Sequence, residues 1–418
     1  MKRSMQTSAR FSYPLAVVFL AGLALEACSP VPELLRRGDQ LAAEGKPEEA
    51  MQAWVEADAH EKETCEALLR AGNLNLKLNR PDAAVAAFEQ AVSKVPTSAA
   101  AYLGLGKAYM AKNIPATAVQ ALDRAISLDN KRAEPFFIKG LIARSQGRMD
   151  EAMQFFDQAI RREPRHAEAH LRRGDIYFGR NDLKEAMQAY SLALASDPEN
   201  VEALIQVGRT YLSAGEPSRA AATLERAVQK NRRNAWAQYY LAEAMMLLKK
   251  PDRAIQALQN ALQQDRKMGM AYVRLGQIYE ASLLPDRAYD AYQRGVAMDP
   301  NLLEGYLNLA RMQFERKQEA EAGRSLEKAL KVNPDCLPCR VLLGRMYLQR
   351  KKFKNAVEVL EKVVQVNYQD NEAHFYLGQA YLFLGMVAKA TAEYNALALA
   401  NDTARAQALL ELINRHSR

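Results

Sequence analysis

Cys336 and Cys339, separated by Leu337 and Pro338, are the residues whose types and spacing could most readily do chemistry. Two cysteines at this spacing can form a disulfide, exchange electrons with a partner, bind zinc or, with a following histidine, hold a haem. Residue 340 is arginine, which excludes haem attachment, and no nearby residues complete a four-ligand zinc site. We favour a structural disulfide, with free thiols and a redox pair as the alternatives.

The histidines form no comparable constellation. His166 and His170 are four residues apart, but no carboxylate supports a metal site beside them. The sequence contains no Gly-rich phosphate loop and no nucleophile elbow. We therefore predict no catalytic residues, no metal, no cofactor and no small-molecule substrate, which means that the protein is not an enzyme.

The first 28 residues have the pattern of a targeting segment. Lys2, Arg3 and Arg10 precede an apolar run over residues 14–25, which is too short to span a bilayer as a helix and fits a secretory signal. The sequence Leu-Glu-Ala-Cys follows and ends at Cys28.

This segment resembles a bacterial lipoprotein signal, in which Cys28 would carry the lipid. Leu25 and Ala27 match the lipobox, whereas Glu26 stands where a small residue is preferred. An uncleaved signal anchor and an ordinary signal cleavage are the alternatives. Ser29 after the cysteine resembles an outer-membrane address, and residues 29–30 are expected to form a short linker.

The rest of the chain repeats with a period of 34 residues. A glycine or alanine column marks the period: Gly38, Gly72, Gly106, Gly140, Gly174, Gly208, Ala242, Gly276, Ala310, Gly344 and Gly378. Alanine follows twelve residues after every member of this column, from Ala50 to Ala390. Eleven repeats in unbroken register are strong evidence for a solenoid of identical supersecondary elements.

Each repeat predicts two helices. When the residues of a repeat are numbered 1 to 34, with the Gly/Ala column at 8, apolar residues at 4, 7, 8 and 11 share one face of a helix A. Those at 20, 24 and 27 share one face of a helix B. Glycine or asparagine at position 15 favours a left-handed turn between them, and proline at 17 suits the start of helix B. We expect the small residue at 8 to pack against the alanine at 20.

These columns, with aromatic residues at 11 and 24 and proline at 32, resemble the tetratricopeptide repeat (TPR) family over residues 31–404. The resemblance implies an all-α, right-handed superhelix of eleven repeats. Residues 405–418 are predicted to form a helix whose apolar face covers the end of the stack. Asp402 or Thr403 would be the N-cap residue of this helix. The period excludes the βαβ setting of thiol oxidoreductases and leaves no segment for a catalytic domain.

In this family, positions 2, 5, 9, 12 and 13 of helix A line a concave, partner-binding groove. Repeat 7 and the start of repeat 8 place large apolar residues there, and we predict a partner-binding patch: Trp236, Tyr239, Met246, Leu247 and Met270. Phe137 and Phe375 at position 5 are further candidates. The alternative is that Trp236 folds over its own helix.

Charge argues against a nucleic-acid partner. The chain of 418 residues has 57 Lys and Arg against 49 Asp and Glu, a net charge of +8, which is small for this length. The predicted groove has more acidic than basic residues, so the basic excess lies outside it. The outer surface is thus free to meet anionic lipid or envelope polymer.

Together these features predict a non-enzymatic protein-binding scaffold, lipid-anchored at the periplasmic face of the cell envelope, with the outer membrane as the favoured address. It resembles the TPR lipoproteins that assist assembly of type IV pili, polysaccharide export or secretion machines. The alternative is an enzyme accessory or redox protein built on Cys336 and Cys339.

Overall fold

The computed structural model describes residues 30–60 and 64–416. The predicted lipobox and Cys28 lie outside these residues, so the signal and the lipid attachment stay predictions. Within the described ranges the chain forms 23 α-helices and no strand, which confirms the all-α prediction.

The helices alternate between the two predicted types. Helices A are α1 (Val31–Ala43), α3 (Glu66–Lys77), α5 (Ala99–Ala111), α7 (Glu134–Ser145), α9 (Ala167–Gly179), α11 (Val201–Ser213), α13 (Ala235–Leu247), α15 (Gly269–Ala281), α17 (Leu303–Glu315), α19 (Leu337–Gln349) and α21 (Asn371–Phe383). Helices B are α2 (Pro47–His60), α4 (Pro81–Lys94), α6 (Pro115–Leu128), α8 (Met149–Arg162), α10 (Leu183–Ser196), α12 (Pro217–Lys230), α14 (Pro251–Gln264), α16 (Pro285–Met298), α18 (Glu319–Val332), α20 (Phe353–Val366) and α22 (Val387–Leu399). The final helix is α23 (Thr403–His416).

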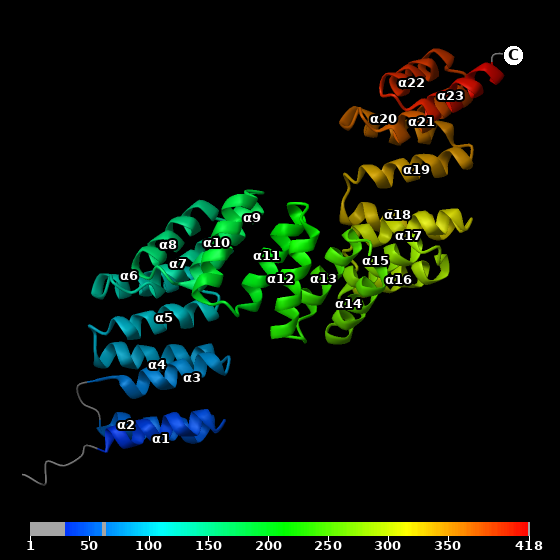
Figure 1. Cartoon of the computed structure of the whole chain (residues 1–418). Coiled ribbons are helices and arrows are strands. Elements are labelled where there is room, and N and C mark those ends of the chain that lie inside the picture. The colour runs from blue at the N-terminus through cyan, green and yellow to red at the C-terminus, as the bar shows by residue number, and fades with distance from the viewer. Residues whose placement is uncertain (1–29, 61–63, 417–418) are drawn as a thin grey trace, which may run out of the picture. The chain divides into compact units, whose positions relative to one another are not determined.

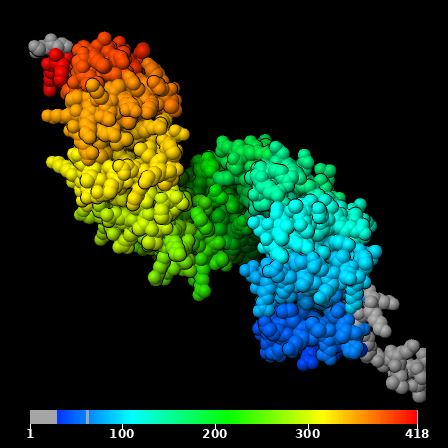
Figure 2. Space-filling view, turned by 180° about the vertical axis from the view of Figure 1, so that it is seen from behind, coloured from blue at the N-terminus to red at the C-terminus, as the bar shows by residue number. Residues whose placement is uncertain are grey.

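The chain divides into two compact parts, residues 1–196 and 197–418. The first contains α1 to α10, hence repeats 1 to 5, and the second contains α11 to α23, hence repeats 6 to 11 and the last helix (Figure 1). Within each part a helix packs mainly against the helices directly before and after it. In Figure 2 the colours accordingly follow one another in bands along each part.

The small residue at position 8 packs against the large residue at position 24. A Cβ atom placed on Gly276 would lie 2.5 Å from Tyr292 Cε1, and one on Gly140 would lie 2.5 Å from Phe156 Cε1. The nearest side chain is that of position 24, which is a leucine opposite Gly106, Gly208 and Gly344. The expected alanine at position 20 also comes close at Gly106, where the Ala118 carbonyl oxygen would lie 3.5 Å from an added Cβ atom. The two repeats with alanine at position 8 have leucine, never a ring, at 24.

The turn between helices A and B is left-handed in every repeat. Positive φ angles occur at position 15 in all eleven repeats, and they include the seven glycines and asparagines that the sequence pointed to. The other four are Lys249, Leu283, Lys317 and Lys351, with φ between 56° and 62°. The packing of helices A and B therefore imposes this conformation even on lysine and leucine, in which the Cβ atom makes a positive φ angle sterically unfavourable.

The last helix covers the open end of the stack, as the sequence predicted. Asp402 accepts a hydrogen bond from the Arg405 backbone N–H at 3.2 Å and caps α23, which begins two residues before the predicted start. Leu409 is fully buried, and its Cδ2 would lie 2.5 Å from a Cβ atom on Gly378. Leu409 thus takes the place that a position-24 side chain fills in the preceding repeats.

Candidate protein-binding face

The helix-A face, formed by positions 2, 5, 6, 9, 12 and 13 of successive helices A, is held together by ion pairs between repeats. Arg274 on α15 donates from Nε to Glu243 Oε1 on α13 at 3.0 Å and from Nη1 to Glu304 Oε1 on α17 at 2.8 Å. One guanidinium therefore joins the helices A of three successive repeats. In the first part of the chain, Arg70 Nε lies 3.1 Å from Asp39 Oδ1 of the preceding helix A.

These pairs correct the prediction of an acidic groove. Acidic residues of this groove have basic partners within 4 Å: Asp39, Glu66, Glu134, Glu168, Asp175, Glu243, Glu280, Glu304 and Glu315. The arginines at position 6, which include Arg70, Arg172 and Arg274, supply much of the positive charge, and position 6 lies outside the predicted groove positions. The face is therefore close to charge-balanced.

Trp236 is a pre-ordered, half-exposed aromatic side chain at the start of α13. Its ring stacks on Tyr240 with centroids 5.8 Å apart and meets the edge of Tyr239 at 5.9 Å. The Arg209 guanidinium lies over the ring of Tyr240, 5.1 Å from its centroid. Trp236 thus packs against its own helix, as the alternative interpretation predicted. At the same time 46% of its surface is exposed, as a partner-binding residue requires.

Tyr239 is not a contact residue, which corrects the sequence prediction. It is 1% exposed, and its hydroxyl donates to Glu243 at 2.9 Å. Burial raises the pKa of the Tyr239 hydroxyl and the Glu243 carboxylate raises it further, so this tyrosine keeps its proton and the hydrogen bond. Its role is to support the Trp236 ring from below.

The apolar residues of repeats 7 and 8 form two separate groups. Trp236 and Met270, 37% exposed, both stand at position 2, where helices A begin. Met246 and Leu247 stand at the other end of α13, about 15 Å further along the helix axis. The ion pair of Glu243 with Arg274 lies between the two ends, so the single continuous patch that the sequence suggested is divided.

Met246 lines a shallow, mostly apolar cavity of about 360 Å³ together with Lys249, Pro251, Gln277, Ile278, Ala281 and Ser282. The neighbouring Leu247 is 59% exposed. Both surfaces lie at the turn end of repeats 7 and 8. This end offers apolar area but no aromatic ring.

Phe137 and Phe375 are half-buried packing residues. Phe137 contacts the rings of Phe156 at 5.8 Å and His166 at 4.8 Å, and Phe375 contacts Tyr376 at 5.5 Å. Phe137 belongs to the first part of the chain and Phe375 to repeat 11. None of these ring contacts involves Trp236, whereas the unpredicted neighbours Tyr240 and Arg209 do belong to its site. Tyr240 could have been found from its i+4 spacing to Trp236.

Cys336 and Cys339 are joined by a disulfide in the structure. They are 5% and 0% exposed, and Cys336 Sγ accepts a hydrogen bond from the Cys339 N–H at 3.2 Å as the N-cap of α19. Ser98 and Asn200 cap helices A from the same repeat position. The pair is therefore a buried part of a helix start, which disfavours exchange with a redox partner.

The described residues contain no cluster of three or more side chains that could hold a metal ion. His170 and His374 are buried packing residues, and each places Nε2 about 3 Å from the carbonyl six residues earlier. Among the helices that the structure describes, none has the length and apolar character needed to cross a membrane.

Family models described as tetratricopeptide repeat match residues 69–135, 139–201, 180–227, 211–275, 313–374 and 347–413. The chain belongs to the tetratricopeptide repeat family. A comparison with curated proteins found no match. As a TPR protein, it has the fold of a protein-interaction scaffold.

Several solved structures are similar to parts of this chain. MamA is 30% identical, with 38% of this chain and 94% of that chain covered and a TM-score of 0.34. PilF of Pseudomonas aeruginosa is 18% identical, with 52% and 97% covered and a TM-score of 0.46. YrrB, described as a TPR protein with an unusual peptide-binding site, is 21% identical, with 47% and 97% covered and a TM-score of 0.35.

Proposed function

We propose that this TPR protein is lipid-anchored through Cys28 at the periplasmic face of the cell envelope, most simply the outer membrane. There it holds a protein partner and assists the assembly of an envelope machine for type IV pili, polysaccharide export or secretion. The lipobox-like sequence that ends at Cys28 supports the anchor. The disulfide between Cys336 and Cys339 supports an oxidising compartment.

The observation that carries the partner-binding proposal is the Trp236 side chain. Nearly half of it is exposed, while Tyr239 and Tyr240 hold its ring in place. A pre-ordered aromatic ring loses little entropy when a partner covers it, and tryptophan is enriched among the residues that dominate interface energetics. The partner's contact is therefore an apolar side chain that sits on the Trp236 ring, next to the charge-balanced centre of the helix-A face.

The partner test uses photo-crosslinking in intact cells. A photoreactive phenylalanine analogue at position 236 should crosslink to one discrete protein, whereas the same analogue at Val366, which is 72% exposed, is the matched control. Trp236→Ala should lower co-purification of that protein about tenfold or more without changing the melting temperature. Equal capture from both positions, or a collapsed melting curve for Trp236→Ala, would contradict the proposal.

The anchor is tested separately. Labelling with a palmitate analogue should mark the parent chain and fail with Cys28→Ser, and the variant should leave the membrane fraction. Membrane fractionation that stays unchanged in Cys28→Ser would count against lipid attachment and would leave the Trp236 test unaffected.

A further inference from the structure

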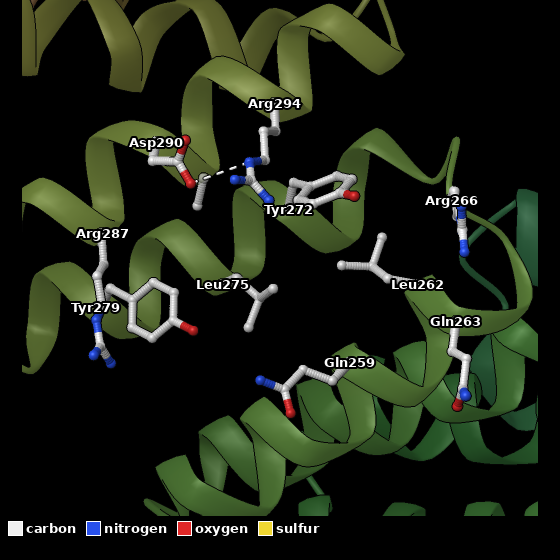
Figure 3. Close-up of a pocket in the computed structure, with 11 residues that line it drawn as sticks. Gln259, Leu262, Gln263, Arg266, Tyr272, Leu275, Tyr279, Arg287, Asp290 and Arg294 are labelled. Atoms are coloured by element: carbon white, nitrogen blue, oxygen red, sulfur yellow. Dashed lines mark ion pairs between the residues drawn. The ribbon is translucent and has the colours of Figure 1, made fainter.

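A cavity of about 440 Å³ lies on the side of repeats 7 and 8 that the helices B form, between α14, α15 and α16 (Figure 3). Its volume is within the range of about 300–1,000 Å³ that is usual for small-ligand sites. It shares no lining residue with the helix-A face around Trp236. It is therefore a second site, separate from the one proposed to bind protein.

The rim of the cavity has an excess of positive charge. Three arginines line it, and Asp290 is the only acidic lining residue. Arg294 Nε pairs with Asp290 at 3.1 Å, whereas Arg266 and Arg287 have no carboxylate partner among the residues that the structure describes. Figure 3 places Arg287 beside Tyr279 and Arg266 at the opposite end of the cavity, so each guanidinium can bind a separate carboxylate through its planar, forked donors.

The walls are aromatic and the floor is apolar. Tyr272 and Tyr279 are half-buried, and Leu275, at 6% exposure, lies between them in Figure 3. The Arg287 guanidinium carbon lies 6.0 Å from the centre of the Tyr279 ring, which holds the cation beside the wall. A ligand body with a flat apolar face fits against these rings.

Two amides complete the rim. Gln259 and Gln263 on α14 line the cavity and are exposed. Each side-chain amide has both donor and acceptor atoms, so it can pair with a hydroxyl group in either sense. A ligand that fits all these groups has a carboxylate, several hydroxyls and a flat apolar face.

The preceding repeat contains the same cavity without this chemistry. That cavity, of about 380 Å³, has Gln238 and Met245 where the other has Tyr272 and Tyr279. Its Arg253, which corresponds to Arg287, pairs with Glu225 at 2.8 Å. The cationic and aromatic lining is therefore a property of repeat 8 and not of the fold.

We propose that the cavity between α14, α15 and α16 binds an acidic sugar unit, a uronic acid, within an anionic polysaccharide. Arg266 and Arg287, at opposite ends of the cavity, bind the carboxylates of this unit and of its neighbour in the chain, the tyrosines stack on the apolar face of the ring and the glutamines bind its hydroxyls. The two tyrosines favour this ligand over a peptide of acidic residues, because such a peptide can pair with the amides through its backbone but has no flat ring face to stack on Tyr272 and Tyr279. This activity goes beyond partner binding and adds a carbohydrate ligand to the scaffold.

The test measures binding of trigalacturonate to the full chain in detergent by isothermal titration calorimetry. Maltotriose, which is neutral, and a peptide of three glutamates serve as comparison probes. Trigalacturonate should bind, and each comparison probe should bind at least about tenfold more weakly. The double variant Arg266→Gln with Arg287→Gln should weaken trigalacturonate binding about tenfold or more, because both carboxylate ligands are lost.

Arg253→Gln is the matched control, because it removes the corresponding arginine of the preceding cavity. It should change the affinity less than about twofold, and so should Trp236→Ala. Equal binding of maltotriose, equal or tighter binding of the peptide, equal loss with Arg253→Gln, or no binding of trigalacturonate at millimolar concentration would each overturn the proposal. A failed crosslink at Trp236 with intact trigalacturonate binding would contradict the protein-binding proposal alone.

Discussion

His374 Nδ1 lies 2.5 Å from Glu393 Oε2, although His374 is only 2% exposed. The imidazole connects α21 to α22, and its Nε2 lies 2.9 Å from the Tyr368 carbonyl oxygen. The hydrogen bond that the imidazole donates to Glu393, together with this carbonyl and the nearby Asp370, raises the pKa of His374 above its usual value against the opposing effect of burial. Repeat 11 therefore contains a buried ion pair that depends on protonation.

This pair predicts a pH-dependent stability. A histidine whose pKa is raised on folding stabilises the folded state below about pH 6.5 and loses that contribution as the pH rises through the raised pKa. Glu393→Gln should lower the free energy of unfolding by about 1–2 kcal/mol at pH 6 and by less at pH 8.5. Urea titrations at both pH values measure this, with the exposed Glu411→Gln as control. A loss that is equal at both pH values would contradict the titration of His374.

The close contact between Gly276 and Tyr292 predicts that replacement of this glycine lowers the stability of the protein. Gly276→Ala should cost about 1–3 kcal/mol, because Tyr292 must move and its hydroxyl is held by Glu280 at 3.0 Å. Gly344→Ala, opposite Leu360, should cost much less, since Ala242 already stands opposite Leu258. Tyr292→Leu in the Gly276→Ala background should recover part of the loss. Thermal melts of the single and double variants decide this.

We predict that replacement of Leu283 by asparagine stabilises the protein. Leu283 has φ 58° and is 88% exposed. Its left-handed conformation therefore costs free energy that no packing of the side chain offsets. Leu283→Asn should raise the free energy of unfolding by up to about 1 kcal/mol, because asparagine tolerates this conformation. The neighbour Leu284 has φ −113°, and Leu284→Asn should give no such gain. A lower melting temperature for Leu283→Asn would show that the leucine stabilises the turn by other means.

We predict that truncation of a buried side chain in the capping helix α23 destabilises the end of the stack. Leu409→Ala should destabilise the chain by about 2–4 kcal/mol, because Leu409 is fully buried over Gly378. Glu411→Ala, at an exposed position of the same helix, should change stability by less than about 0.5 kcal/mol. Removal of residues 403–418 should be at least as harmful as Leu409→Ala. A melting curve that is unchanged by the removal would contradict the capping role.

Much of the fold could be predicted from the period, and less of the site. The turn at position 15 was visible wherever glycine or asparagine stands there, as at Gly45 and Asn79, but the same turn at Lys249 and Leu283 was not. Their side chains carry no local preference for positive φ; the packing of helices A and B imposes it. Trp236 was predicted as exposed from its position, whereas Tyr239, three residues later on the same helix, is buried.

The sequence by itself determined the eleven helix pairs, the seven turns that contain glycine or asparagine, and the capping helix, because apolar periodicity and turn chemistry act over a few neighbouring residues. The tertiary structure decided which side chains meet: Gly276 with Tyr292, and Arg274 with Glu243 and Glu304. It also placed two tyrosines and two free guanidinium groups around one cavity. These contacts depend on the distances between packed helices, and a periodic pattern specifies the face of a helix but not the depth to which a neighbour approaches it.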